Sequence, residues 1–289
     1  MFGAYLYKLG AYLAIRLPRN VSERIVRFIA DLQYFLRFKV RRSVIANQRI
    51  VHGNTLSEKE LRKTARSVFR SFARTMYWFL RLPALGVEEL KTAADTEILE
   101  MFSRGLSSKG GFIMTSAHMG PWEIGGVWLA ANGFKVNTVA LDHPSEPVTV
   151  FFNERRELFG MRVFPLKSSF MSLKHALDRG ECIVLLVDRS YGGTGRQSRW
   201  FGRDVSLPIG HLLLAMRCRV PVVTSAFVFD VKEGFKLVIK GVHYPDPQLG
   251  EKDAIKHLQS RCLEDLESLV KEFSDQWYQF THLESSRIE

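Results

Sequence analysis

Cysteine is scarce in this chain, and its few residues show no pattern of disulfides or of metal ligands. The three cysteines, Cys182, Cys218 and Cys262, stand far apart in the sequence. An odd number without paired spacing argues against a disulfide framework and favours a reducing compartment. The eight histidines form no ligand-like pairs either, and only His118 stands in a context that suggests chemistry. We therefore expect no metal site and no cofactor.

A long apolar run is also missing. A membrane-spanning helix needs about 20 predominantly apolar residues, whereas the apolar and aromatic stretch Phe2–Leu17 is interrupted by Lys8 and Arg16. The next stretch, Val21–Val40, has apolar residues at helical spacing with basic residues between them. We expect residues 1–55 to form amphipathic helices that lie on a membrane, so that the protein is peripheral or monotopic. An ordinary amphipathic helix packed on the core is the alternative.

Negative charge is the minority charge. Lysine and arginine number 41 against 30 aspartates and glutamates, and the formal net charge is +11. Much of the excess lies before Pro83, in the same region as the amphipathic pattern. A basic surface attracts anionic lipid and would also attract an acidic carrier protein. Nucleic acid is the competing partner for such a charge, but no zinc-finger, RRM or KH motif is present, so we do not expect it.

Internal repeats, low-complexity tracts and linkers are absent, which predicts one compact domain overall. Its larger part, residues 56–289, alternates between helical and strand patterns. Ser57, with Glu60 three residues later, is a capping box that predicts a helix running to Leu80. A second helix is expected over Val87–Phe102.

The strand pattern predicts the fold class. Short runs rich in apolar and β-branched residues, separated by helical segments, are typical of an α/β fold with a largely parallel central sheet and helices on both faces. The last two strands are expected to form an antiparallel hairpin through Lys232–Gly234. The predicted strands are Phe112–Ser116, Val136–Leu141, Met161–Pro165, Ile183–Val187, Val222–Phe229 and Phe235–Ile239.

The most informative motif, TSAHMGPWE, follows the first predicted strand and contains His118 and Glu123. It leads from a strand into a helix, at the carboxyl edge where α/β sheets expose reactive groups. An imidazole, with an ordinary pKa of about 6.5, can take a proton from a hydroxyl near neutral pH, and a carboxylate can orient it. We expect His118 to be a general base oriented by Glu123; a hydrogen-bonded surface pair is the alternative. Ser116 lacks the Gly-x-Ser-x-Gly elbow of a hydrolase nucleophile.

Several further blocks, taken with this motif in their order and spacing, resemble one family. The blocks are Ala117–Gly126, Glu146–Gly160, Cys182–Gly192, Trp200–Gly202 and Asp275–Phe280. They resemble the lipid A biosynthesis acyltransferases, the late lauroyl and myristoyl transferases of the lysophospholipid acyltransferase superfamily. In that family a histidine, four residues and an acid carry catalysis, and the resemblance therefore implies that His118 and Glu123 are catalytic.

The resemblance also implies substrate-binding residues. Arg155 is a candidate ligand for a phosphate of the acceptor or donor, because a guanidinium binds phosphate oxygens in a bidentate way. Asp188 is a candidate to orient His118 or Arg155, and two aromatic residues are candidates to line an acyl tunnel. The alternatives are a surface arginine, a strand-end cap and ordinary core aromatics. The full set of candidates is Arg155, Asp188, Arg189, Tyr191, Trp200 and Phe201, of which Arg189 departs from the family pattern.

The function that the resemblance implies is transfer of a fatty acyl chain from a carrier thioester to a hydroxyl of a lipid A precursor. The expected partners are acyl carrier protein, a glycolipid acceptor and an anionic membrane surface, at the cytoplasmic face of the bacterial inner membrane. Two other interpretations stay open. One is an acyltransferase for another glycolipid or lysolipid, with acyl-CoA as donor. The other is a membrane-bound lipid-binding protein without catalysis, against which the intact pair His118 and Glu123 argues.

Overall fold

The computed structural model describes residues 2–53, 55–94, 111–166, 169–190, 195–230 and 234–283. Three features expected from the sequence fall outside these residues. They are the end of the second predicted helix beyond Ala94, the candidate Tyr191, and most of the turn between the last two strands.

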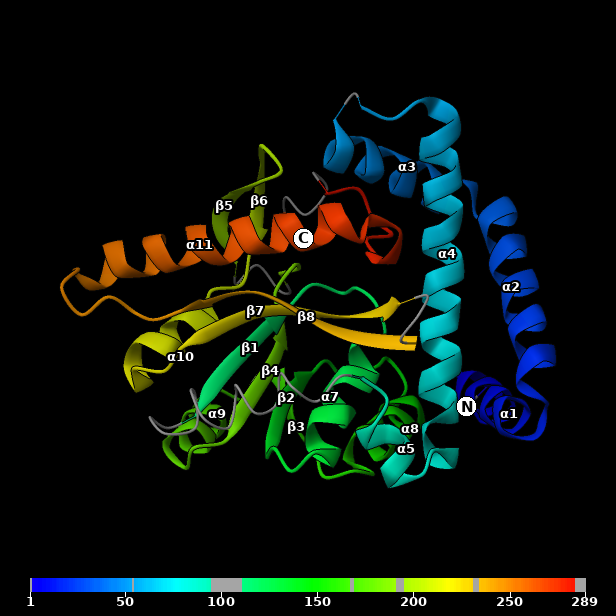
Figure 1. The fold of residues 1–289 in the computed structure, drawn as a ribbon, viewed down its shortest axis with the longest axis horizontal. Helices are drawn as coiled ribbons and strands as arrows, with labels where there is room; N and C mark the ends of the chain where they lie inside the picture. The colour runs from blue at the N-terminus through cyan, green and yellow to red at the C-terminus, as the bar shows by residue number, and fades with distance from the viewer. Residues whose placement is uncertain are drawn as a thin grey trace.

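A six-stranded sheet forms the centre of the molecule, in the order β3-β2-β4-β1-β7-β8 (Figure 1). The neighbours from β3 to β7 pair in parallel, and β8 pairs with β7 in antiparallel fashion. This confirms the largely parallel sheet, and each predicted strand is present, the last one longer than expected. The strands are β1 (Phe112–Ser116), β2 (Val136–Ala140), β3 (Arg162–Pro165), β4 (Cys182–Leu186), β7 (Val222–Asp230) and β8 (Gly234–His243).

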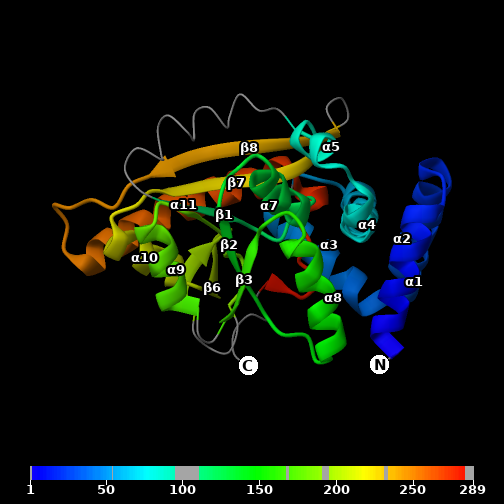
Figure 2. The same cartoon turned by 90° about the horizontal axis from the view of Figure 1, so that it is seen from below.

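Helices cover both faces of the sheet (Figure 2). Successive strand residues point to opposite faces, so Met114 belongs to the core beneath α7 and α8 while Ile113 belongs to the core beneath α9, α10 and α11. Burial on both faces is why these strands read as nearly continuous apolar runs. The helices are α7 (Trp122–Ala131), α8 (Glu146–Glu157), α9 (Ser169–Asp178), α10 (Gly210–Cys218) and α11 (Glu251–Glu272).

Four long helices open the chain; α1 and α2 lie on the outer side of α4, and α3 lies on its inner side, toward α11 (Figure 1). The capping box at Ser57 is confirmed, since Ser57 Oγ accepts a hydrogen bond from the Glu60 amide and Glu60 Oε2 accepts one from the Ser57 amide at 2.8 Å. Of the described helices, not one combines the length and the apolar character that crossing a bilayer requires. The four are α1 (Phe2–Arg16), α2 (Arg19–Leu36), α3 (Phe38–His52) and α4 (Glu58–Arg81).

The helix predicted over Val87–Phe102 is shorter than expected. After a 3₁₀ turn at Leu82–Ala84, the helix α5 spans only Val87–Lys91, and Thr92 to Ala94 are not helical. Leu90, Trp128 and Phe79 lie in one core cluster, so the short helix α5 packs against α7 and α4.

A second, two-stranded sheet was not predicted. Strands β5 (Arg196–Trp200) and β6 (Arg203–Leu207) pair in antiparallel fashion beside α11 (Figure 1). Phe201 and Gly202 form the turn between them with positive φ angles of 49° and 69°. A two-residue turn of that hand fits the natural twist of a hairpin. The mostly polar strand β5 lacks the apolar run by which the other strands are recognised.

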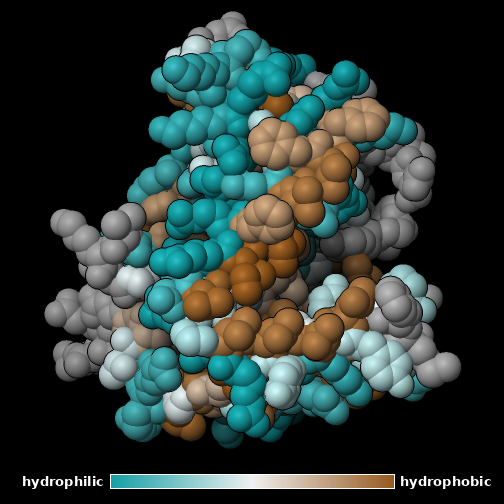
Figure 3. Space-filling view, turned by 90° about the vertical axis from the view of Figure 1, so that its right-hand side faces the viewer, coloured by the Kyte–Doolittle hydropathy of each residue, from teal (hydrophilic) through white to brown (hydrophobic). Residues whose placement is uncertain are grey.

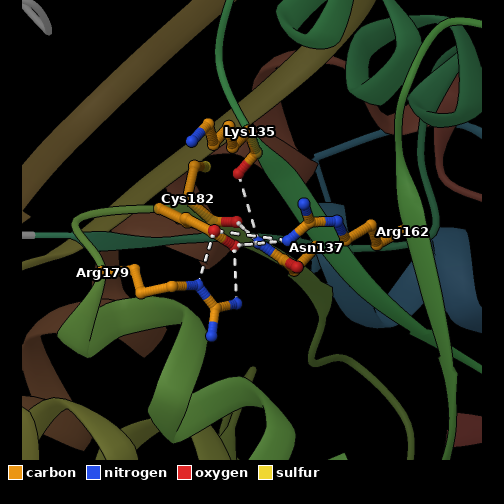
Figure 4. A network of polar contacts seen from close by, with 6 residues as sticks. Lys135, Asn137, Arg162, Arg179 and Cys182 are labelled. Carbon is orange, nitrogen blue, oxygen red and sulfur yellow. Dashed lines mark hydrogen bonds and ion pairs between the residues drawn. The ribbon is translucent and has the colours of Figure 1, made fainter.

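A buried carboxylate ties three strands together at the amino-terminal edge of the sheet (Figure 4). Glu181, just before β4, accepts hydrogen bonds from Asn137 Nδ2 at 3.0 Å, Arg179 Nε at 2.8 Å and Arg162 Nη1 at 3.2 Å. The hydrogen bond from Arg179 is the largest of the effects that lower the pKa of Glu181 to about 2. The network joins β2, β3 and β4 at the edge away from the loop that carries His118.

Candidate active site

The loop between β1 and α7 carries His118, and a glycine gives the loop its shape. Gly120 has a φ of +54°, and a Cβ at this position would collide with the carbonyl oxygen of Phe227. Glycine is the residue that accepts both the left-handed backbone and the close approach. The Gly120 carbonyl accepts a hydrogen bond from Thr75 Oγ1 at 3.2 Å, so α4 also holds the loop.

The C-terminal block Asp275–Phe280 lies beside this loop. The Tyr278 amide donates a hydrogen bond to the His118 carbonyl at 2.8 Å, and Met119 forms an antiparallel bridge with Trp277. The block therefore behaves as a short strand paired to the histidine loop. This pairing carries the Trp277 indole into the site.

His118 is hydrogen-bonded to a carboxylate from the next strand of the sheet. Its Nδ1 lies 2.6 Å from Oδ1 of Asp188, whose Oδ2 accepts a hydrogen bond from Nε1 of Trp277 at 3.1 Å. Burial raises the pKa of Asp188, but the charge and hydrogen bond of His118, with help from Arg189 and Trp277, outweigh burial and hold this pKa well below its usual range. An ionised carboxylate only accepts hydrogen bonds. Nδ1 of His118 therefore carries a proton toward Asp188, so that in the neutral imidazole Nε2 is the nitrogen with the lone pair.

Glu123 has a different partner from the one expected. Its carboxylate accepts hydrogen bonds from Nε and Nη2 of Arg156 at 2.9 Å and 2.7 Å, and both side chains are largely buried. Glu123 lies in the first turn of α7 and Arg156 in the last turn of α8, so the pair joins two helices. In this geometry the carboxylate that touches the imidazole comes from Asp188, which corrects the expected contact between Glu123 and His118.

A cavity of about 670 Å³ opens beside His118. Trp122, Glu123, Arg156 and Arg189 line it together with His118, and most of the remaining wall is apolar. The apolar wall comes from both faces of the sheet at its carboxyl edge and includes Met114, Leu129, Met161, Val184, Phe227 and Leu237 on the α7 side, and Phe170, Leu173, Leu185 and Leu214 on the α9 and α10 side. Its size and lining are those of a site for an apolar ligand.

The two candidate arginines lie in different surroundings. Arg189 lines the cavity, and its Nη2 donates a hydrogen bond to the Tyr278 carbonyl. Arg155 is absent from the described cavity wall; its guanidinium lies 3.5 Å from the ring centroid of Phe151, and its Nη1 donates to the Phe151 carbonyl at 3.1 Å. The neighbouring Arg156 takes the position at the cavity that was expected for Arg155.

The aromatic candidates Trp200 and Phe201 lie behind the site instead of in the described cavity wall. The Trp200 ring is fully buried, with its centroid 5.5 Å from that of Trp277 and 5.0 Å from that of Phe201. Both residues therefore support Trp277, which in turn donates to Asp188. Tyr191 lies outside the described residues.

Sequence reasoning missed Arg156 and Trp277. Arg156 stands directly after Arg155, and adjacent helical residues point in directions about 100° apart, so only the packing of α8 shows which arginine reaches the cavity. Trp277 was part of a recognised block, but its hydrogen bond to Asp188 depends on the pairing of that block with the His118 loop.

Metal ligands do not gather anywhere in the described ranges, where no group of three or more His, Cys, Asp or Glu side chains is placed to hold an ion. The three cysteines are free, and Cys182 and Cys262 are buried. Burial raises the pKa of the Cys262 thiol to about 12, which keeps it protonated and unreactive.

The bacterial lipid A biosynthesis acyltransferase family matches residues 1–283. The chain belongs to this family. The resemblance inferred from the sequence blocks is thereby confirmed, and the match extends it to the N-terminal helices.

Two relatives carry the name phosphatidylinositol mannoside acyltransferase. The protein from Mycolicibacterium smegmatis is 31% identical over 172 residues, which are 57% of this chain and 54% of that protein. The protein from Mycobacterium tuberculosis is 28% identical over 148 residues, which are 48% of this chain and 47% of that protein. The matched region thus spans about half the length of these curated relatives.

Proposed function

We propose that this protein transfers a fatty acyl chain from a thioester donor to a hydroxyl of a glycolipid, with His118 as the general base. The observation that carries the proposal is the position of His118, which stands in the wall of a largely apolar cavity with its Nδ1 bound to the ionised carboxylate of Asp188. The free Nε2 can take a proton, and the apolar wall suits a fatty chain. Membership of an acyltransferase family supports the reaction class.

The proposed reaction is one acyl exchange without a covalent enzyme intermediate. The acceptor oxygen attacks the thioester carbonyl carbon while Nε2 of His118 takes the hydroxyl proton. The new carbon–oxygen bond forms, the carbon–sulfur bond breaks, and the leaving thiolate takes the proton back from His118. Asp188 holds the imidazole and stabilises its charged form, and Trp277 fixes Asp188.

Glu123 has an indirect role in this proposal. It holds the Arg156 guanidinium at the cavity wall through two hydrogen bonds, and Asn153 accepts a third from Arg156 at 3.1 Å. Together with Arg189, Arg156 places two guanidinium groups in the wall. Guanidinium groups bind phosphate oxygens well, so we assign to Arg156 and Arg189 the phosphate-binding role first expected of Arg155.

The proposed acceptor is a phosphate-bearing glycolipid. The family is named for lipid A biosynthesis and the two relatives for a phosphatidylinositol mannoside, so a lipid A precursor and a mannosylated phosphatidylinositol are the acceptors to test. The net charge of +11 favours an acidic acyl carrier protein as donor, and acyl-CoA is the alternative.

An apolar band on α1 and α2 is proposed as the membrane contact (Figure 3). On α2 the residues buried against the protein are Ser22, Ala30 and Tyr34, whereas Phe28 and Leu36 are each 68% exposed. The exposed apolar residues of this band are Tyr5, Leu6, Leu9, Tyr12, Leu13, Ile15, Val21, Ile25, Phe28, Ile29, Leu32, Phe35 and Leu36. A continuous exposed band of this kind, edged by arginines, suits the surface of an anionic bilayer. The proposed location is the cytoplasmic face of the bacterial inner membrane.

The function is tested with labelled acyl thioesters of acyl carrier protein and of CoA, each combined with each of the two glycolipid acceptors. Native protein, His118→Ala and the matched control His257→Ala, at an exposed histidine of α11, are compared. We expect acylated glycolipid from the native protein and the control. His118→Ala should form at least about 100-fold less of this product.

Two outcomes contradict the proposal in different ways. Equal product from native protein and His118→Ala would remove His118 from the reaction. Lipid binding by the native protein without product from any donor and acceptor pair would favour a lipid-binding protein without catalysis.

A further inference from the structure

The cavity wall holds a second histidine that the mechanism above does not use. His211, the second residue of α10, is 6% exposed and lines the same cavity as His118. Its Nδ1 is enclosed and has no hydrogen-bond partner in the described part of the chain. Burial lowers the pKa of His211 to about 4, so the ring is neutral at neutral pH. A neutral imidazole offers one N–H and one lone pair, and it suits an uncharged polar group.

Two other enclosed polar atoms of the wall, Ser116 Oγ and Arg189 Nε, also lack a hydrogen-bond partner within the described residues, although Arg189 Nε lies 4.0 Å from Oδ2 of Asp188. Both lie next to the reacting pair in the sequence, Ser116 two residues before His118 and Arg189 directly after Asp188. His211 differs from them because it lies on α10, far in the sequence from His118 and Asp188.

The surroundings of His211 explain why the protein supplies no partner. The other cavity-lining side chains of α9, α10 and the same face of β4 are Ser169, Phe170, Leu173, Leu185 and Leu214. All are apolar except Ser169, whose hydroxyl donates a hydrogen bond to the Leu166 carbonyl at 3.1 Å. We call this part of the cavity the α10 lobe. An enclosed imidazole nitrogen in an apolar lobe is unfavourable unless a ligand pairs with it.

The part of the cavity on the other face of the sheet has a different character. In this α7 lobe, a Cβ at Gly125 would lie 2.7 Å from the Phe227 Cβ, and one at Gly126 would lie 2.9 Å from the Met161 Cε. The two glycines thus bring α7 close to its neighbours, and Leu129 and Leu237 add to the apolar wall. A lobe lined in this way suits a hydrocarbon chain.

We propose that His211 binds the polar arm of the acyl donor by hydrogen-bonding an amide group near the thioester, while the acyl chain lies in the α7 lobe. The proposal rests on the proposed function, because it concerns the donor of that reaction. A pantetheine arm is linear, uncharged and rich in amides, so it can enter an apolar lobe and still pair with one neutral imidazole. The head group of a glycolipid is broad and covered with hydroxyls, and one polar group in an apolar lobe does not match it. The thioester then lies where the two lobes meet, beside His118.

The test is a binding measurement that needs no turnover. The probe is S-dodecyl pantetheine, a thioether that carries the arm and the chain but cannot transfer an acyl group; dodecanol is the probe without the arm. Both are titrated by calorimetry into native protein, His211→Leu, His211→Asn and the surface control His257→Leu. We expect His211→Leu to bind the thioether about tenfold more weakly, the size of one neutral hydrogen bond. His211→Asn should recover most of this affinity, and dodecanol should bind all four proteins alike.

A spectroscopic readout separates a direct contact from a structural effect. In protein with ¹⁵N-labelled histidine, addition of the thioether should shift the His211 ring nitrogen signals, and dodecanol should not. The melting temperature of His211→Leu should equal or exceed that of the native protein, because an apolar side chain replaces an unpaired buried polar one.

Three outcomes overturn the inference. In the first, native protein and His211→Leu bind the thioether with equal affinity. In the second, His211→Leu loses as much affinity for dodecanol as for the thioether. In the third, His211→Leu has a higher KM for the glycolipid and an unchanged KM for the donor. The two proposals fail separately. Thioether binding that depends on His211 in a protein without transfer activity would overturn the proposed function alone, and active protein indifferent to His211→Leu would overturn this inference alone.

Discussion

Nδ1 of His118 lies 2.6 Å from Oδ1 of Asp188, although the two residues are 70 positions apart in the sequence. The strand register explains the contact. Ser116 and Leu186 are partners at the ends of the parallel strands β1 and β4, and the two functional residues each follow two positions later. Adjacent parallel strands end at the same edge of a sheet, so residues at equal distances beyond their ends meet.

The pairing predicts that Asp188→Asn lowers kcat strongly and leaves the donor KM nearly unchanged. An amide in place of the carboxylate no longer holds Nδ1 as the protonated nitrogen and no longer stabilises the imidazolium. We expect a loss of about 100-fold or more in kcat, measured with whichever donor and acceptor support transfer. Asp253→Asn, at an exposed position of α11, is the control. A kcat within threefold of native in Asp188→Asn would contradict the assignment of Asp188.

The pair Glu123 and Arg156 predicts a difference between two adjacent arginines. Arg156→Ala leaves the largely buried Glu123 carboxylate without its partner and should lower the free energy of unfolding by about 3 kcal/mol. Arg155→Ala breaks no ion pair among the described residues and should cost less. Urea unfolding of both variants measures the difference. Adding Glu123→Leu to Arg156→Ala should restore part of the stability, and no restoration would contradict the explanation by an unpaired charge.

The exposed band predicts that membrane binding can be removed without unfolding the protein. Phe28→Glu combined with Leu36→Glu places two carboxylates on α2 where side chains are exposed, so the melting temperature should stay near native. Cosedimentation with vesicles that contain anionic lipid should weaken at least about tenfold, because apolar burial is lost and the new charges are repelled. Leu249→Glu, before α11, is the control. Equal binding by the double variant would show that the band does not contact the bilayer.

The network around Glu181 predicts a pH dependence of stability. The folded-state pKa of about 2 lies below the ordinary value of 4.5. The contribution of Glu181 to the free energy of unfolding is therefore complete above about pH 4.5 and decreases as the pH falls toward 2. Between pH 5 and 2 the native protein should lose on the order of 2 kcal/mol more stability than Glu181→Gln, measured by urea unfolding at each pH. An equal change in the free energy of unfolding with pH in the two proteins would contradict the role of this network.

Local sequence patterns were sufficient to predict most helices and strands of the fold. The capping box at Ser57, the buried strands and the largely parallel sheet follow from periodicity and from residues close in the sequence, and the structure confirms each. The position of His118 at the carboxyl edge follows in the same way. The strand β5 escaped prediction because a mostly polar edge hairpin carries little hydrophobic signal.

The sequence offered both Glu123 and Asp188 as the acid that orients His118, but it could not decide between them, because partners across the fold depend on strand register and on how helices pack. The nearest acid in sequence to His118, Glu123, is turned toward Arg156 on α8, and the distant Asp188 takes its place. The direction of the apolar face of α2 was equally undetermined, since an amphipathic pattern is the same whether that face meets the core or the outside. The sequence by itself therefore determined the strands of the central sheet, the capped helix α4 and the place of His118 after the first strand. Only the tertiary structure decided which carboxylate holds that histidine, because contacts between distant segments are formed by packing.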